Sequence, residues 1–310
     1  MRCRNVSVES PSGFLTGIED MAGMSNGALL LSAYSRRNPE DWPVGLFIVQ
    51  PDFKNDHWTA KPLLALGKGT FPHGFAVNET EETLAVIIRS KNGKPKLGLY
   101  DLEDEALQFR AWLADPERWT SPIDYPCNMN DAAFISEADV VVTNDRASCT
   151  SAAKLIETVT GKASGQLLKL SLTGEVERLD DSLYFPNGVT GDTRGDVFAA
   201  QTRGKKLSQL KNGQDWDLPG APDNVLYDNN SNSIWAAAIP SLLRYSAFQR
   251  GLLPGKSASL AIQVSLEHQS IETYITSAFE GATSVALLPN ALVLSGAFSD
   301  GLALCDRPDA

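Results

Sequence analysis

The sequence holds few of the residues from which zinc sites are built. It has 4 cysteines and 3 histidines in 310 residues, and no C-x-x-C pair occurs anywhere. Clusters of cysteine and histidine at defined spacings are the signature of structural zinc. Because cysteine and histidine are so scarce, the sequence excludes the class of proteins that are built around a zinc cluster.

Long apolar runs are missing as well. No stretch approaches the roughly 18 apolar residues that a membrane-spanning helix needs, so we expect no transmembrane segment. Met1-Arg2-Cys3 leads directly into polar sequence, and we expect no signal peptide within it. Because a leader can be removed, the compartment stays open; a disulfide would favour the secretory pathway.

Basic residues are fewer than acidic residues. The chain has 27 lysines and arginines against 38 aspartates and glutamates, which gives a net charge of -11 and a pI near 4.8. Phosphate backbones and anionic membranes attract basic proteins. We therefore expect no nucleic-acid partner and a small molecule as substrate, with the oligomeric state left open.

Helical periodicity is rare, and only residues 103–113 and 148–160 resemble helices. The rest follows one module, in which a turn and a short apolar strand lead, after a polar gap, to a second strand. Its six copies start near residues 19, 73, 130, 187, 223 and 282. The starts lie on average about fifty residues apart, which is the spacing of propeller blades.

The repeat predicts an all-β fold, a six-bladed β-propeller in a single domain over residues 1–310. The short interval from 187 to 223 predicts one blade with tight outer connections. Three long, irregular stretches are expected to form lids. These stretches are residues 60–70, 148–162 and 201–220.

Polar side chains precede the first strand in five of the modules. They are Glu19 and Asp20, His73, Asn130 and Asp131, Asn187, and Asp223 and Asn224. Any one pair could be an ordinary turn, where such residues are common. The innermost strands of a propeller face a central channel, however, so their shared position favours convergence on one site. Carboxylate and amide oxygens are the ligands that calcium prefers.

The four cysteines are placed unevenly. Cys3 and Cys305 lie near the two ends of the chain, and in a ring-shaped fold a bridge between them would close the ring and restrict the unfolded chain. Two unpaired thiols near the termini are the alternative. Cys127 and Cys149 are expected to be buried or free.

With its motifs in this order, the chain resembles the paraoxonase family and, more distantly, the gluconolactonase/senescence-marker and strictosidine-synthase-like propellers. The likeness begins at Gly17-Ile18-Glu19-Asp20 and ends at Gly281-Ala282-Thr283-Ser284-Val285. Between them, in family order, lie Pro72-His73-Gly74, Asn128-Met129-Asn130-Asp131, Thr143-Asn144-Asp145, Asn187-Gly188 and Asp223-Asn224. Each motif is short, and the specificity lies in the ordered set, which spans nearly the whole chain.

The resemblance implies calcium in the central channel. A catalytic ion would be ligated by Glu19, Asn130, Asn187, Asp223 and Asn224. A second, buried ion would be held by Asp20, Asp131 and a backbone carbonyl near Phe75. The chemistry agrees, because a hard cation that takes about six to eight oxygens accepts amides beside carboxylates.

The chain also departs from the family pattern. The family's hydrolases carry a second histidine after the next strand, where residues 87–91 have none, and Arg146 follows Thr143-Asn144-Asp145. His73 is left as a lone base or as a structural residue of the channel. Arg89 and Arg146 could bind an anionic or enolate oxygen, or they could be solvated surface arginines.

Three functions fit the sequence. The first is calcium-dependent hydrolysis of lactones or aryl esters, with His73 or Glu19 assisting proton transfer. The second is a non-hydrolytic natural-product cyclase, such as a hetero-Diels–Alderase of fungal secondary metabolism, which the missing histidine favours. The third is a binding propeller without catalysis. The complete ligand set places the hydrolase first.

Overall fold

The computed structural model describes residues 1–38, 43–78, 80–91, 93–103, 106–252 and 258–308, and these are almost entirely β. They form two compact units, residues 1–72 with 218–310, and residues 73–217. Among the described residues, no helix is long and apolar enough to cross a membrane.

The first unit contains a nine-stranded sheet and a four-stranded sheet. The nine strands are β1 (Cys3–Ser10), β2 (Gly13–Phe14), β3 (Ile18–Gly23), β4 (Leu29–Ala33), β5 (Gly45–Val49), β6 (His57–Ala65), β23 (Ser284–Leu288), β24 (Ala291–Ser295) and β25 (Leu302–Asp306). The four are β19 (Ala221–Asp228), β20 (Ser233–Ile239), β21 (Ser259–Ser265) and β22 (Ile271–Thr276).

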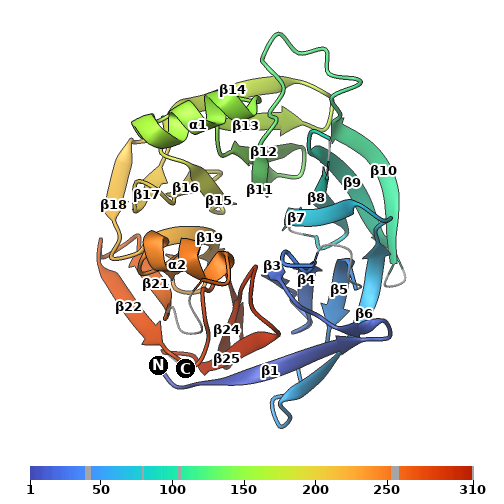
Figure 1. The fold of residues 1–310 in the computed structure, drawn as a ribbon, viewed down its shortest axis with the longest axis vertical. Coiled ribbons are helices and arrows are strands. Elements are labelled where there is room, and N and C mark those ends of the chain that lie inside the picture. The colour runs from blue at the N-terminus through green and yellow to red at the C-terminus, as the bar shows by residue number, and fades with distance from the viewer. Residues whose placement is uncertain (39–42, 79, 92, 104–105, 253–257, 309–310) are drawn as a thin grey trace. The chain divides into compact units, whose positions relative to one another are not determined.

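Strand β1 joins the two ends of the chain in one sheet. It runs antiparallel to β25 and parallel to β6, and Figure 1 shows the N and C termini close together at this point. Cys3 lies directly opposite Cys305, and the two form a disulfide. The predicted bridge between the termini is therefore confirmed.

Residues 73–217 contain three four-stranded sheets, the first of which begins just before the boundary between the units. The first sheet consists of β7 (Thr70–Val77), β8 (Thr83–Ser90), β9 (Lys96–Glu103) and β10 (Ala106–Ala114). The second consists of β11 (Met129–Ser136), β12 (Asp139–Asn144), β13 (Gly165–Ser171) and β14 (Val176–Leu183). The third consists of β15 (Pro186–Gly191), β16 (Val197–Gln201), β17 (Lys206–Gln209) and β18 (Gln214–Asp217).

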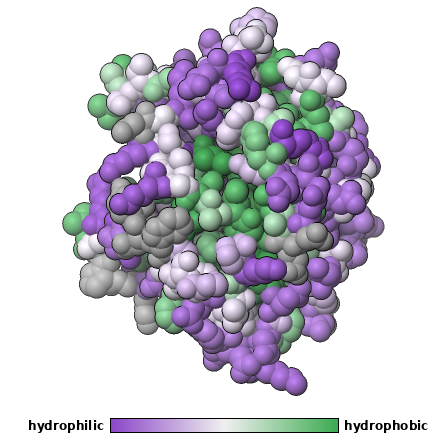
Figure 2. Space-filling view, turned by 90° about the vertical axis from the view of Figure 1, so that its right-hand side faces the viewer, coloured by the Kyte–Doolittle hydropathy of each residue, from purple (hydrophilic) through white to green (hydrophobic). Residues whose placement is uncertain are grey.

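The six predicted modules are all present as pairs of neighbouring strands. They are β3 with β4, β7 with β8, β11 with β12, β15 with β16, β19 with β20, and β23 with β24. The apolar runs fill the interior, where Trp58 and Trp235 are each only 1% exposed. On the face seen in Figure 2, hydrophilic residues predominate and apolar residues gather toward the middle.

Two expectations about irregular stretches were wrong. The stretch 103–113 was expected to be helical, but residue 103 ends β9, residues 104–105 lie outside the described residues, and the rest belongs to β10, where Phe109 pairs with Tyr100 on β9 and its ring contacts Tyr100 and Trp112. Residues 201–220, expected to be a lid, contain β17 and β18, whose short hairpin accounts for the tight outer connections. The stretch 60–70 is largely the end of β6 and the start of β7.

The helices were predicted in part. Helix α1 (Ser151–Thr160) confirms the helix expected within 148–160, and the Thr150 side chain caps its N-terminus. Helix α2 (Leu242–Gln249) was missed, although Ser241 caps it in the usual way. Its Tyr245 and Phe248 pack with Ala221 of β19 and Ile239 of β20, and Figure 1 shows α2 next to β19.

Cys127 and Cys149 also form a disulfide, contrary to the expectation that they are buried or free. The pairing of Met129 with Asn144 on β11 and β12 brings the flanking segments together, and Asp145 N donates to Asn128 O at 3.1 Å. The bridge therefore follows from strand register, which the sequence spacing of 22 residues alone does not reveal.

Candidate functional site

Four of the five predicted polar motifs share one local geometry. Strand pairing is irregular between Ile18 and Asp20 on β3, and across residues 129–132, 186–189 and 222–225 on β11, β15 and β19. A β-bulge leaves a residue outside the ladder and redirects its side chain. The motif residues at these irregularities, each 8% exposed or less, are Glu19, Asp20, Asn130, Asp131, Asn187, Asp223 and Asn224.

In the first unit, Asp20 joins three strands. Its Oδ1 accepts hydrogen bonds from Met21 N at 2.9 Å, Asn224 Nδ2 at 3.1 Å and Ser284 Oγ at 3.1 Å. These donors come from β3, β19 and β23. A buried carboxylate that accepts hydrogen bonds from several strands holds those strands together, because charge-assisted hydrogen bonds are stronger than neutral ones.

The same network fixes the side-chain amide of Asn224. Its Nδ2 donates to Glu19 O at 3.1 Å as well as to Asp20, and its backbone N donates to Thr283 O at 2.9 Å. The buried Oδ1 of Asn224 accepts no hydrogen bond from the described residues, and neither does Oδ1 of Asp223. Two oriented oxygens in this unit are therefore left for a ligand.

A half-buried arginine lies near these residues. Arg36 forms an ion pair with Glu19 and lies 5.4 Å from the Tyr34 ring centroid and 5.5 Å from that of Phe298. Burial opposes its charge, but Glu19 raises the pKa of Arg36. Burial also raises the pKa of Asp223, and so does Glu19, whereas Arg36 lowers it. With Asp20, the acids here outnumber the one cation.

In the second unit, Asp131 plays the part that Asp20 plays in the first. Its Oδ1 accepts from Ala132 N at 2.8 Å and its Oδ2 from Val189 N of β15 at 2.9 Å. Thr143 Oγ1 accepts from Asp131 N at 2.9 Å and donates to Asn187 O at 2.6 Å. The buried Oδ1 of Asn187 accepts no hydrogen bond from the residues that the structure describes.

Strand β7 approaches the second of these motifs very closely. A Cβ atom at Gly74 would lie 2.5 Å from Asp131 Oδ1 and 2.6 Å from Asn130 O, so only glycine fits there. His73 and Phe75 flank it and are 1% and 5% exposed. The predicted base and the predicted carbonyl ligand thus lie next to Asn130 and Asp131.

The donor oxygens fit calcium better than a softer metal. Among the described residues, no three histidine, cysteine, aspartate or glutamate side chains gather closely enough to hold a metal ion. In each unit one buried amide oxygen accepts no hydrogen bond from the described residues, Oδ1 of Asn224 in the first unit and Oδ1 of Asn187 in the second. Calcium accepts amide oxygens beside carboxylates, whereas zinc prefers nitrogen and sulfur.

Four strand pairs carry an arginine at the same end as the polar motif. They are Arg36 after β4, Arg89 in β8, Arg146 after β12 and Arg203 after β16. The sequence pointed to Arg89 and Arg146 but not to the other two. Strand register could have found them, since Ile18 pairs with Ala33 and Pro186 with Gln201. Residues after a second antiparallel strand lie beside the start of the first.

Two of these arginines lie over one phenylalanine. The guanidinium carbons of Arg146 and Arg203 are 5.1 Å and 4.9 Å from the ring centroid of Phe185. Phe185 has a φ of 58°, which is rare for a bulky residue. Burial and Arg146 lower the pKa of Arg203. This cation-rich cluster was not predicted.

The Arg146 segment is connected to the metal-ligand candidates. Burial raises the pKa of Asp145, whereas Arg89, Arg146 and the Asn130 side chain lower it. Arg89 donates to Met129 O at 2.6 Å. Arg89 and the segment that carries Arg146 are thus neighbours of the motif at Asn130.

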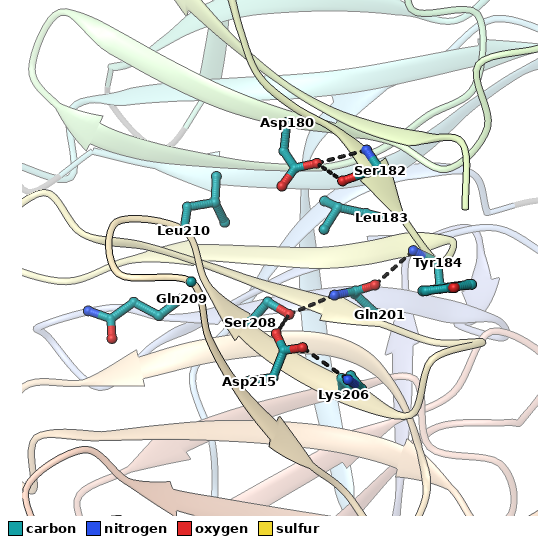
Figure 3. Close-up of a pocket in the computed structure, with 11 residues that line it drawn as sticks. Asp180, Ser182, Leu183, Tyr184, Gln201, Lys206, Ser208, Gln209, Leu210 and Asp215 are labelled. Carbon is teal, nitrogen blue, oxygen red and sulfur yellow. Dashed lines mark hydrogen bonds and ion pairs between the residues drawn. The ribbon is translucent and has the colours of Figure 1, made fainter. Parts of the chain in front are cut away.

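A cavity with a volume of about 260 Å³ lies elsewhere in the second unit. None of the predicted site residues lines it. Figure 3 shows Ser208 donating to Asp215 and accepting from Gln201 Nε2, while Lys206 pairs with Asp215 at 3.0 Å. Because these polar groups bind one another, the cavity offers little to a ligand.

Comparison with known proteins shows the fold. No family model and no curated protein sequence matches the chain. Among solved structures, a gluconolactonase from Xanthomonas campestris matches with a TM-score of 0.60 and 14% identity, covering 95% of this chain and 87% of its own. A luciferin-regenerating enzyme matches with a TM-score of 0.60 and 11% identity, covering 95% and 93%.

A third match is a catalytically inactive variant of virginiamycin B lyase from Staphylococcus aureus, solved with quinupristin. Its TM-score is 0.53 and its identity 9%, covering 94% of this chain and 95% of the lyase. All three are β-propellers of the gluconolactonase-like type. At these identities the likeness concerns the fold alone, and the chain shares that fold.

Proposed function

We propose that the chain is a calcium-dependent hydrolase of lactones or aryl esters, paraoxonase-like in its site and built as one six-bladed propeller over residues 1–310. The ordered motifs support this, as does the fold shared with a gluconolactonase. The proposal assigns the catalytic ion to Glu19, Asn130, Asn187, Asp223 and Asn224. It assigns a structural ion to Asp20, Asp131 and a carbonyl near Phe75.

One observation carries the proposal. Buried oxygens of Asp223, Asn224 and Asn187 accept no hydrogen bond from the described residues, although buried acceptors in proteins nearly always have a donor. Leaving such a group without a partner costs about 1–3 kcal/mol each. Two of these oxygens lie in the first unit and one in the second, each at an equivalent strand irregularity, and a bound cation would supply the partner that each of them lacks.

In this proposal, different residues of the chain bind the metal and transfer the proton. A calcium ion bound there supplies a positive charge that polarises a substrate carbonyl. Asn224, held by Glu19 and Asp20, keeps its oxygen in a fixed direction. The His73 imidazole takes a proton from the attacking water, and the ion pair with Arg36 holds the Glu19 carboxylate in place.

Chelation tests the hydrolase directly. Purified protein with calcium should hydrolyse a δ-lactone or a phenyl ester, and EDTA should abolish the activity until calcium is restored. Asp223→Ala and Asn187→Ala should each lower kcat/KM by at least about 100-fold, as expected for loss of a group that positions the metal. If no lactone or aryl ester turns over with calcium present, the hydrolase proposal fails.

A second function is favoured by Arg36. Its ion pair with Glu19 already places a cation against one of the candidate ligands, and a guanidinium can hold an enolate or carbonyl oxygen. The alternative is therefore a cyclase, such as a hetero-Diels–Alderase of natural-product biosynthesis, which needs positioning more than a base. Reaction in ¹⁸O-labelled water separates the two, because only hydrolysis incorporates the label.

A further inference from the structure

The cluster at Phe185 contains two guanidinium groups without a direct acidic partner. Arg146 forms no side-chain hydrogen bond or ion pair with the described residues, and its Nε is buried without an acceptor. Among the described residues, the Arg203 side chain has one hydrogen bond, to Thr158 Oγ1 at 3.5 Å. Bringing two like charges over one ring is unfavourable unless an anion lies between or beside them.

The surrounding charges leave an excess of positive charge. Arg89 and Lys154 also face Asp145, while the acids of the cluster are Asp145 and Glu157. Four cations therefore meet two carboxylates. Glu157 is itself engaged, since its Oε1 accepts from Ser148 N at 3.2 Å and from Ser148 Oγ at 2.7 Å. The cluster is short of negative charge in a protein whose net charge is -11.

The segment that carries Arg146 is held in place. The Cys127–Cys149 disulfide fixes one end. Asn128 Nδ2 donates to Arg146 O and to Ser148 O, both at 2.9 Å, and Asn128 N donates to Asn144 Oδ1 at 2.8 Å. A flexible surface arginine needs no such support, whereas a binding residue benefits from it.

The segment that carries Arg203 is held as well. Arg203 N donates to Tyr184 O at 3.3 Å, and Thr202 N donates to Phe185 O at 3.1 Å. Tyr184 N in turn donates to Gln201 Oε1 at 2.7 Å. These bonds keep Phe185 in its left-handed conformation, with its ring beneath both guanidinium groups.

We propose that Arg146 and Arg203, with Phe185, form a binding site for the carboxylate group of an organic acid. The planar fork of a guanidinium matches the two oxygens of a carboxylate, and the ring provides an apolar flank for the carbon skeleton. In naming the substrate class, this inference rests on the proposed function: the lactone or ester would carry a free carboxylate. The binding itself does not require turnover.

Calorimetric titration of the calcium-loaded protein at fixed ionic strength tests the site. The probes are benzoate, benzyl alcohol and phenyl phosphate. Benzoate should bind at least 10-fold more tightly than benzyl alcohol, and Arg146→Gln and Arg203→Gln should each weaken benzoate at least 10-fold, or about 1.4 kcal/mol. Arg146→Lys should restore part of the loss, since it keeps the charge and removes the fork.

The control is Arg178→Gln, which removes an exposed arginine of the same unit that pairs with Asp181. It should leave benzoate binding unchanged, and circular dichroism should show all variants folded. The inference is overturned if benzoate binds no better than benzyl alcohol, or if both arginine variants keep wild-type affinity. Tighter binding of phenyl phosphate would overturn the carboxylate assignment. A protein that binds benzoate but hydrolyses nothing would refute only the proposed reaction.

Discussion

At the scale of single residues, the buried carboxylates are of two kinds: some accept hydrogen bonds from neighbouring strands, and one has an oxygen that accepts none from the described residues. Asp20 and Asp131 receive donors from neighbouring strands, whereas Asp223 has a carboxylate oxygen that accepts no hydrogen bond from the described residues. The division matters because it separates residues whose loss should damage folding from a residue whose loss should damage ligand binding.

Replacing Asp131 with alanine should destabilise the protein even when no metal is present. The change leaves Ala132 N and Val189 N buried without their acceptor, which should lower the free energy of unfolding by about 3 kcal/mol. Urea unfolding in EDTA measures this. Asp131→Asn keeps one acceptor oxygen and should lose less; equal stability of wild type and both variants in EDTA would contradict the structural role.

Asp192 should make part of the stability depend on acid pH. Burial works against its charge, but hydrogen bonds from Arg194 and from Asp196 N hold the pKa of Asp192 below its ordinary value. A lowered pKa stabilises the fold above the unfolded value of about 3.9, and the contribution disappears as the pH falls through the folded value. Asp192→Asn should therefore reduce stability at pH 6, and its difference from wild type should shrink as the pH falls below about 3.9. A difference that stays constant over this range would count against it.

At the scale of elements, the site depends on irregular strand starts and on one close approach between strands. Gly74 lets β7 lie against Asn130 and Asp131. Gly74→Ala should cost about 1–3 kcal/mol of unfolding free energy, because the added methyl group overlaps backbone atoms. Gly67→Ala is the matched control, since its nearest contact would be an ordinary 3.9 Å to Thr70 Oγ1. Thermal unfolding of both variants decides, and equal midpoints would argue against the close approach.

The sequence predicted the strand pairs better than it predicted what connects them. Alternation of short apolar strands and polar gaps found all six inner pairs, since that pattern depends only on local burial. It missed α2, whose eight residues give little periodic signal, and assigned β10 to a helix because pairing with β9 is not a local property. Cys127–Cys149 was missed for the same reason.

The candidate site was predicted as far as residue type allows. The polar motifs were visible because acids and amides at strand starts are conspicuous, and the structure shows them at matching irregularities. Arg36, Phe185 and Arg203 were not predicted. These residues matter because the end of one strand contacts the start of its partner. Such contacts can be recognised only when the register of the two strands is known.

At the scale of the whole molecule, two disulfides restrict the chain to different extents. Cys3–Cys305 joins residues 302 apart in sequence, and Cys127–Cys149 joins residues 22 apart. Because the entropy removed from the unfolded chain grows with loop length, we expect losses of about 5 and about 3 kcal/mol. Chemical unfolding of Cys3→Ser/Cys305→Ser and Cys127→Ser/Cys149→Ser tests this order. A larger loss for the second pair would contradict it.

The central claim is that the side-chain oxygens of the polar motifs, which lie at the starts of strands, bind calcium. The most direct measurement is the calcium content of the protein by elemental mass spectrometry after saturation with calcium and removal of free metal. We predict at least about one calcium per chain, reduced in Asp223→Ala and in Asn187→Ala but unchanged in Arg178→Gln. Calcium no higher than in the buffer for wild type, or equal calcium in all four proteins, would contradict the account.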